Sequence, residues 1–400
     1  MNPQQQLYQF PPELLRASKK DRLAYYDDYM MGHPYLDEAF EMLKTIIHEH
    51  GESRLVFIFG PTGAGKTTVR LLAEKWVIEQ FFPVLKTDKG FVPVSSVEAV
   101  IPKSGLFNVK DHLKRSLRAL HEPEELINYK INYGVKGVYC DTTGELVIQP
   151  RIVESELGWA LEQALKHRRP RIFFIDEAHH LLAVASGRKL TDVPEAIKSL
   201  ANRTGILHGL LGTYELLTLH DVGDQLSRRS IYIHLPRYNA EYMEDRDIWQ
   251  GIVWNFQLNV PVPEIPDFLS HWEYLYERSL GCVGIIKNWT RNALADALEE
   301  NAKTVSLKHL EKRALSVGQC QNIFKYIKEG EKRYAEIEGD VQKLRGELGL
   351  DIEPISRKEA KLRPYQKILQ GRQPSHQAKR NVGKRKPQRD PIGREKNAEN

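Results

Sequence analysis

The sequence LVFIFGPTGAGKTT at residues 55–68 decides the fold of this chain. Its first part, Leu55 to Phe59, is an unbroken apolar run that predicts a buried strand. The segment Lys66 to Gln80 has apolar residues at helical spacing and predicts a helix. The residues between match the pattern GxxxxGK[ST] at Gly60, Gly65, Lys66 and Thr67. Because strand, glycine-rich loop and helix follow one another, we expect a phosphate-binding loop, or P-loop.

The loop predicts a nucleotide site with ATP and Mg²⁺ as ligands. Glycines let consecutive backbone N–H groups point at phosphate oxygens, and the start of the following helix adds its positive dipole end. We expect Lys66 to hold the β- and γ-phosphates and Thr67 to bind Mg²⁺. The other loop residues expected against the nucleotide are Pro61, Thr62, Gly63, Ala64 and Thr68. A glycine turn without a ligand is the alternative, and the flanking strand and helix disfavour it.

A second motif, IFFIDE at residues 172–177, places two carboxylates after a buried strand. Ligands of open α/β sheets bind at the carboxyl ends of the strands. We therefore expect Asp176 to hold Mg²⁺ through its water shell and Glu177 to orient and polarise an attacking water. An acidic helix start is the alternative for such a pair, because carboxylates favour the helix dipole there.

The rest of the first 237 residues alternates between predicted strands and helices, which indicates an α/β fold with an open, mainly parallel sheet covered by helices. Helical periodicity precedes the first strand, between Leu36 and Ile47. A short hairpin is expected across the turn at residues 141–144, inside an insertion at about 124–150. The further predicted strands are 91–100, 171–175, 206–211 and 231–235, and the helices are 109–120, 153–166 and 193–202.

From Tyr238 onward the pattern is helical and contains no strand signal. Helices are predicted around 249–256, at 266–280, at 283–300 and at 307–348, the last interrupted near Gly318 and Gly330. We therefore expect an N-terminal helical lead-in at 1–50, a nucleotide-binding α/β domain at 51–237, a helical lid or C-terminal domain at 238–348 and a basic disordered tail at 349–400.

The composition fits a soluble cytoplasmic protein. Of 400 residues, 41% are hydrophobic and 28% charged, and the apolar runs are too short to span a bilayer. The first residues lack a signal-peptide pattern. The three cysteines are far apart and have no CxxC spacing, which favours reduced thiols over disulfides or zinc. The basic excess lies in the tail, where residues 357–400 hold 14 Lys and Arg against 4 Asp and Glu.

These motifs and their order resemble the AAA+ superfamily, and finer features resemble the TnsC/TniB transposition ATPases. The features are DEAHHLL at residues 176–182, Arg22 with Tyr25, Tyr26 and His33-Pro34, the segment 107–123, LGTYEL at 211–216 and LSRR at 226–229. The resemblance covers about residues 20 to 300. It implies Walker A and Walker B motifs in a hydrolysing, magnesium-dependent ATPase.

The resemblance assigns roles to several residues outside the two motifs. Thr213 corresponds to the sensor-1 residue that reads the γ-phosphate, with an ordinary helix cap as the alternative. Arg228 and Arg229 lie where an arginine finger reaches a neighbouring subunit's phosphate, with a solvated basic pair as the alternative. Lys287 resembles a sensor-2 position, although an arginine is more usual there.

An N-terminal segment borders the adenine in relatives, so the resemblance places Tyr26 and His33 against the base, with core packing as the alternative.

His179 and His180 lie beside the carboxylates. Adjacent histidines point to different faces and no third ligand is spaced nearby, so helix packing is favoured over metal binding.

For DNA, the resemblance points to a basic group after the second strand, formed by Lys103, Lys110, Lys114 and Arg115. Such contacts would go to phosphates and carry little sequence information, and a solvated helix face is the alternative. The basic tail is a second candidate, either for DNA or for a transposase subunit.

The predicted function is an ATP-dependent regulator of transposition that forms a ring or filament on double-stranded DNA and disassembles on hydrolysis. Its expected partners are transposase subunits of the TnsA and TnsB type and a TniQ- or TnsD-like target-selection protein or CRISPR effector. The alternatives are an initiator or helicase-loader ATPase, or a nucleotide-gated scaffold such as a secretion-linked ATPase.

Overall fold

The computed structural model describes residues 8–49, 53–102, 105–121, 131–183, 192–222, 230–339 and 341–350. The chain forms two compact units, Met1–Glu338 and Gly339–Asn400. In the second unit the described residues include one short helix, α13 (Val341–Glu347). No helix among the described residues is long and apolar enough to cross a membrane.

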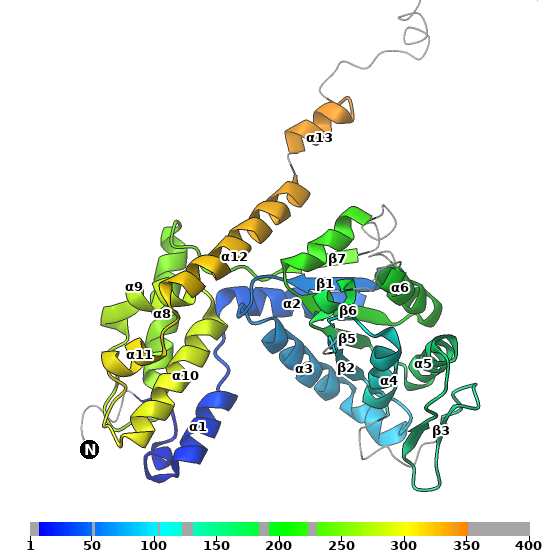
Figure 1. Cartoon of the computed structure of the whole chain (residues 1–400), viewed down its shortest axis with the longest axis horizontal. Coiled ribbons are helices and arrows are strands. Elements are labelled where there is room, and N and C mark those ends of the chain that lie inside the picture. Colours follow the sequence, from blue (N-terminus) through cyan, green and yellow to red (C-terminus); the bar gives the residue numbers. More distant parts are fainter. Residues whose placement is uncertain are drawn as a thin grey trace, which may run out of the picture. The chain divides into compact units, whose positions relative to one another are not determined.

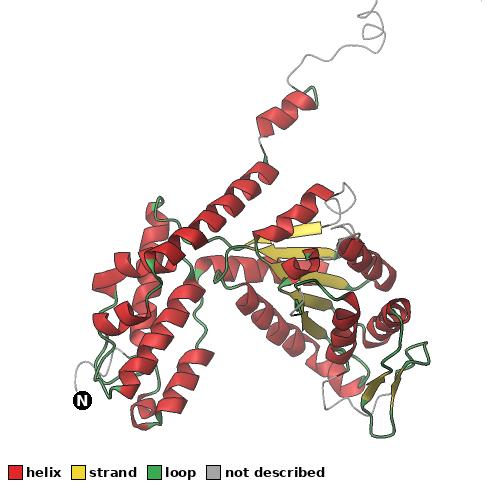
Figure 2. Ribbon diagram, in the orientation of Figure 1, coloured by secondary structure: helices red, strands yellow, loops and turns green. Residues whose placement is uncertain are grey.

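A five-stranded parallel sheet forms the centre of the first unit (Figures 1 and 2). Its strands are β1 (Leu55–Phe59), β2 (Val94–Glu98), β5 (Ile172–Asp176), β6 (Leu207–Gly212) and β7 (Ser230–His234). The spatial order is β2-β5-β6-β1-β7, so β1 lies between β6 and β7. Strands β1 and β6 are buried along their whole length, as expected for a parallel sheet covered on both faces.

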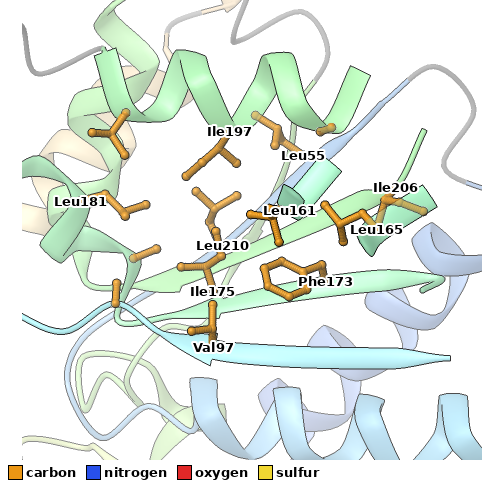
Figure 3. Close-up of a cluster of buried hydrophobic side chains, with 14 of the residues drawn as sticks. Leu55, Val97, Leu161, Leu165, Phe173, Ile175, Leu181, Ile197, Ile206 and Leu210 are labelled. Atoms are coloured by element: carbon orange, nitrogen blue, oxygen red, sulfur yellow. The ribbon is translucent and has the colours of Figure 1, made fainter. Parts of the chain in front are cut away.

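Helices cover both faces of the sheet, and alternate residues of each strand supply the two cores. Val56, Ile58 and Phe174 pack with α2 (Pro34–Glu49) and α3 (Lys66–Thr87). On the other face, Phe173 and Ile175 pack with residues of α4, α5 and α6, as Figure 3 shows for Leu161 and Ile197. These helices span Val109–Ala119, Glu154–Arg168 and Asp192–Thr204.

A helical region with its own core follows the sheet. It contains α8 (Met243–Asn259), α9 (Trp272–Ser279), α10 (Val283–Glu299) and α11 (Leu307–Arg313), and α1 (Lys19–Asp28) packs against α10. Trp249, Phe256 and Leu294 are among its buried side chains. Short 3₁₀ helices lie at Pro12–Arg16, Ala178–Leu182, Tyr214–Val222 and Leu269–His271.

Several predicted elements differ in extent from those observed. The expected helix at 266–280 is a 3₁₀ turn followed by α9, and α3 continues past Gln80 to Thr87. The predicted interruption near Gly318 is confirmed, because α11 ends at Arg313, Ala314 is extended, and α12 (Val317–Glu338) begins after it. The interruption predicted near Gly330 was wrong, because α12 runs through that residue.

Gly330 lies inside α12 at a point where the helix packs closely against Tyr214. A Cβ there would lie 2.2 Å from the Tyr214 ring.

The expected hairpin is present as β3 (Val138–Cys140) and β4 (Leu146–Ile148), paired antiparallel. Part of the predicted insertion, 124–130, lies outside the described residues.

Candidate nucleotide site

The loop between β1 and α3 fits its surroundings only with glycine at two positions. A Cβ on Gly60 would lie 2.0 Å from the carbonyl oxygen of Leu235, and one on Gly63 would lie 2.9 Å from the Ile285 side chain. Gly63 and Gly65 have φ of 80° and 99°, which favours glycine. The N–H of Gly284, at the start of α10, donates to the carbonyl of Gly63 at 2.7 Å. The helical region therefore contacts the loop directly.

Lys66 begins α3 and is buried within the loop, with 9% of the residue exposed. Its ammonium donates to the carbonyls of Gly60 at 3.1 Å and Pro61 at 2.9 Å. Burial lowers the pKa of Lys66, and the carboxylates of Glu177 and Asp176 oppose that shift. The cation therefore lies within the field of both carboxylates of the second motif.

The Thr67 hydroxyl donates to Asp176 Oδ2 at 3.2 Å. This contact joins the two sequence motifs, 109 residues apart, at the carboxyl ends of β1 and β5. A hydroxyl and a carboxylate at this spacing suit a hard cation such as Mg²⁺. No group of three or more His, Cys, Asp or Glu in the described part of the chain could hold a metal ion.

Arg70, one turn after Lys66 on α3, is an addition that the sequence motifs did not predict. Its Nε donates to the same Asp176 oxygen at 3.1 Å, and its Nη1 donates to Ser96 on β2 at 3.1 Å and to Glu74. Helical spacing of four residues from Lys66 is the signal that could have suggested it. Arg70 offsets the charge of the carboxylate expected to hold Mg²⁺.

Glu177 follows β5 in a left-handed conformation, with φ of 50° and ψ of 36°. Its side chain is 43% exposed, and one carboxylate oxygen lies 3.3 Å from Nδ1 of His179. That nitrogen has no hydrogen-bond partner among the described residues, so no hydrogen bond joins the two side chains. Burial, followed by the charge of His180, lowers the pKa of His179. His180 contacts the carbonyl of Ala99, which fits the packing role expected for this pair.

Thr213 follows β6 and is buried beside the helix α12. Its carbonyl accepts from Leu216, as a cap of the 3₁₀ helix would. Its hydroxyl lies 3.1 Å from the Tyr326 hydroxyl, which also donates to Glu215 at 2.9 Å. Thr213 therefore caps the 3₁₀ helix through its backbone while its hydroxyl contacts α12. Tyr326 lies 113 residues away in the sequence, and no local pattern signals it.

A small cavity of about 60 Å³ lies against the loop. Four of its lining residues come from the sequence predictions: His33, Gly65, Thr68 and Lys287. The imidazole of His33 is buried, and its Nδ1 accepts from the Leu36 N–H at 3.4 Å and contacts the Tyr238 hydroxyl at 2.9 Å. Burial lowers the pKa of His33 to about 4, so the ring is neutral at pH 7.

Lys287 lines this cavity but directs its ammonium at the N-terminal region. Its Nζ donates to the carbonyl of Asp27 at 2.8 Å, and Arg291, one turn later, pairs with the Asp27 carboxylate at 2.9 and 3.1 Å. Burial lowers the pKa of Lys287. Both cations therefore tie α10 to the end of α1.

Tyr26 is fully buried in the core of the helical region and is not one of the residues that line the cavity. Its hydroxyl lies 2.9 Å from Thr290 Oγ1 on α10. Arg22 and Tyr25 likewise contact Pro261 and Asn259. For Tyr26 the structure therefore agrees with the packing alternative and not with a contact to the base.

Three of the four residues proposed for DNA, Lys110, Lys114 and Arg115, lie on α4. Lys110 and Lys114 are partly exposed, while Arg115 pairs with Asp111 at 2.7 Å, which offsets its charge. His112, Ser116 and Leu117 form the buried face of this helix. Lys103, Arg228, Arg229 and the tail from residue 351 lie outside the described residues.

Comparison with known proteins supports the nucleotide-binding fold. Residues 49–220 match the family model described as AAA domain. A search of curated protein sequences gave no match. The match and the parallel five-stranded sheet with its flanking helices confirm the expected fold class, a P-loop AAA+ α/β fold followed by a helical region.

Solved structures resemble the chain at low identity. A Walker-type ATPase of Pyrococcus abyssi is 15% identical over 84% of this chain and 88% of that chain, with a TM-score of 0.43. The ORC1 protein of Aeropyrum pernix in complex with DNA is 15% identical over 74% and 70%, with a TM-score of 0.47. The RuvB Holliday junction branch migration motor of Thermotoga maritima is 14% identical over 71% and 68%, with a TM-score of 0.36.

Proposed function

We propose that the protein is a Mg²⁺-dependent ATPase whose ATP-bound form assembles on double-stranded DNA and regulates transposition. One observation carries the ATPase part, the meeting of both sequence motifs at the ends of β1 and β5 through Thr67 and Asp176. The transposition part rests on the sequence features shared with TnsC/TniB ATPases.

The loop would bind the phosphates through backbone N–H groups at the start of the 22-residue helix α3. Lys66 has its ammonium on two carbonyls of the same loop, and phosphate oxygens would replace these weaker acceptors. The lowered pKa of a buried lysine favours such a charged partner, because the partner restores the stabilisation that burial removed.

Thr67 and Asp176 would hold Mg²⁺, the carboxylate acting through the metal's water shell. When bound, the metal neutralises phosphate charge that builds up during transfer. Glu177 lies next to Asp176 with its carboxylate 43% exposed, so it can accept a proton from an attacking water. Thr213 would donate its hydroxyl proton to the γ-phosphate. Arg228 and Arg229 stay predictions for a neighbouring subunit's site.

We place an edge of the base at the cavity beside the loop, which at about 60 Å³ does not hold a whole nucleoside. His33, Thr68 and Lys287 line it together with Gly65 of the loop. Since Nδ1 of His33 accepts from a backbone N–H, its Nε2 carries the proton. That donor lies on the side of Gly65, 4.0 Å from where a Cβ on the glycine would be.

A mobility-shift assay with duplex DNA at moderate salt tests the DNA-dependent assembly. With a non-hydrolysable ATP analogue, the wild type should retain the DNA and Lys66→Ala should not. Replacing Lys110 and Lys114 by Gln should weaken binding and reduce its salt dependence. The matched control replaces Lys325 and Lys332, exposed lysines of α12, and should bind as the wild type does. If the analogue never promotes retention, the DNA-regulator proposal is abandoned.

Transposition is tested separately, by adding purified transposase subunits of the TnsA and TnsB type to the DNA-bound assembly. A transposition regulator should retain them only with the analogue bound. An initiator or helicase loader would bind DNA in the same assay and leave the transposase free. That second outcome would contradict the transposition role and would leave the ATPase part of the proposal standing.

A further inference from the structure

A cavity of about 410 Å³ lies between the sheet and the helices α4, α5 and α6, on the face of the sheet opposite α2 and α3. Its volume falls in the range of about 300–1,000 Å³ that is usual for small-molecule sites. Most of its lining is apolar and includes Leu161, Phe173, Ile175, Ile197 and Leu200. Figure 3 shows several of these side chains between α6 and the sheet. No P-loop residue lines it, so it is separate from the nucleotide site.

His208, on the central strand β6, is one of the polar side chains of this cavity. It is 1% exposed, and its Nδ1 donates to the carbonyl of Ile206 at 3.0 Å. That bond fixes the proton of the neutral ring on Nδ1, so Nε2 is left with a lone pair. Nε2 is buried and has no hydrogen-bond partner among the described residues.

His112, on α4, is a second histidine of the cavity lining with a ring nitrogen that is unpartnered among the described residues. It is buried, and its Nδ1 also lacks a partner in the described part of the chain. Burial lowers the pKa of His112 and of His208 to about 4, so both rings are neutral at pH 7. The nearby Ser116 hydroxyl donates its proton to the carbonyl of His112 and can only accept a further bond.

The chemistry of the cavity restricts what could bind there. Buried polar atoms without partners are rare in folded proteins and cost free energy. His208 and Ser116 present acceptors, so an anion such as a phosphate would be repelled. At the rim, Arg203 already pairs with Glu162 at 2.7 Å. A matching ligand is neutral, apolar in its body, and carries an N–H or O–H group.

We propose that this cavity is a binding site for a small neutral apolar molecule whose N–H or O–H group donates a hydrogen bond to Nε2 of His208. The site is independent of the ATPase and transposition proposals. It is tested on the full-length protein by calorimetric titration with indole and with 1-methylindole, which has the same ring system without the N–H donor. Indole should bind at least tenfold more tightly.

Two glycine variants test the location. Gly158 lines the cavity on α5, and a Cβ there would meet no atom within 4 Å, so Gly158→Phe can fill the space without a backbone clash. Gly251 on α8 is equally open but lies elsewhere, so Gly251→Phe is the matched control. Indole binding should be lost in the first variant and unchanged in the second.

His208→Leu tests the hydrogen bond, because it should bind both indoles with equal affinity. If this variant fails to fold, the two glycine variants still test the location of the site, and the comparison of indole with 1-methylindole still tests the hydrogen bond. The absence of indole binding to the wild type, or binding that survives Gly158→Phe, would overturn the proposal. Equal affinity of the wild type for the two indoles would overturn the role of His208.

Discussion

The hydroxyl of Tyr326, in the middle of α12, lies 3.1 Å from the hydroxyl of Thr213 at the end of β6. It also lies 2.9 Å from the Glu215 carboxylate. A phenol has one proton, and the carboxylate is the stronger acceptor. The Tyr326 hydroxyl therefore donates between the Glu215 carboxylate and the Thr213 oxygen, and it holds the Thr213 side chain toward α12.

Tyr326→Phe should therefore raise ATP turnover by about two- to tenfold, the effect of a hydrogen bond of typical strength. The substitution frees the Thr213 hydroxyl for the γ-phosphate. Steady-state phosphate release measures the effect, with Tyr139→Phe, an exposed residue of β3, as the control. Turnover equal to or below that of the wild type would show that α12 does not restrain Thr213.

The close packing of α12 depends on Gly330, which contacts the Tyr214 ring. Gly330→Ala should destabilise the fold by about 1–3 kcal/mol, because its Cβ would lie 2.2 Å from the ring. Gly318→Ala in the same helix meets no atom within 4 Å and should be neutral or stabilising by up to about 1 kcal/mol. Urea unfolding compares the two. Equal stability would contradict the close packing of α12.

Arg70 competes with a cation for Asp176. Arg70→Gln should lower the Mg²⁺ concentration that half-saturates ATP turnover by about threefold, because the carboxylate loses a positive neighbour. Lys75→Gln, an exposed residue of the same helix, controls for the change in net charge. A higher Mg²⁺ requirement in Arg70→Gln would mean that Arg70 mainly positions Asp176.

The buried histidines predict loss of stability in acid. The folded-state pKa of His208 is about 4, below the ordinary value of 6.5, so the unfolded chain takes up the proton first. Stability is complete above about pH 6.5 and falls as the pH drops toward 4, by on the order of 2 kcal/mol at about pH 5 for one histidine. His208→Leu should lose less stability than the wild type between about pH 7.5 and 5, measured by urea unfolding. The exposed His48→Gln should lose as much as the wild type.

Much of the fold could be predicted because the decisive signals are local. The apolar run Leu55 to Phe59 and the loop glycines identify strand, turn and helix from adjacent residues. The strand ending at Asp176 was equally clear, and the two motifs do meet. The continuity of α12 through Gly330 was not predictable, since glycine weakens helices in general and only the tertiary contact with Tyr214 shows why this position is glycine.

The rest of the site depends on contacts between distant segments. The spacing of four residues from Lys66 on one helix could have predicted Arg70. Tyr326 contacts Thr213 through packing that no local pattern signals. Lys287 and His33, which only the family resemblance suggested, come from distant parts of the chain and line one cavity with Gly65. Tyr26 belongs to the same N-terminal segment as His33 and yet packs away from the cavity, because helix α1 buries it against Thr290.

The most direct measurement of the central claim compares ATP binding and ATP turnover in the wild type and Glu177→Gln. The amide keeps the shape of the side chain and removes the base that activates water. Turnover should fall by about a hundredfold or more, while ATP binding with Mg²⁺ stays within about threefold of the wild type. Undiminished turnover in Glu177→Gln would contradict the assignment of this site.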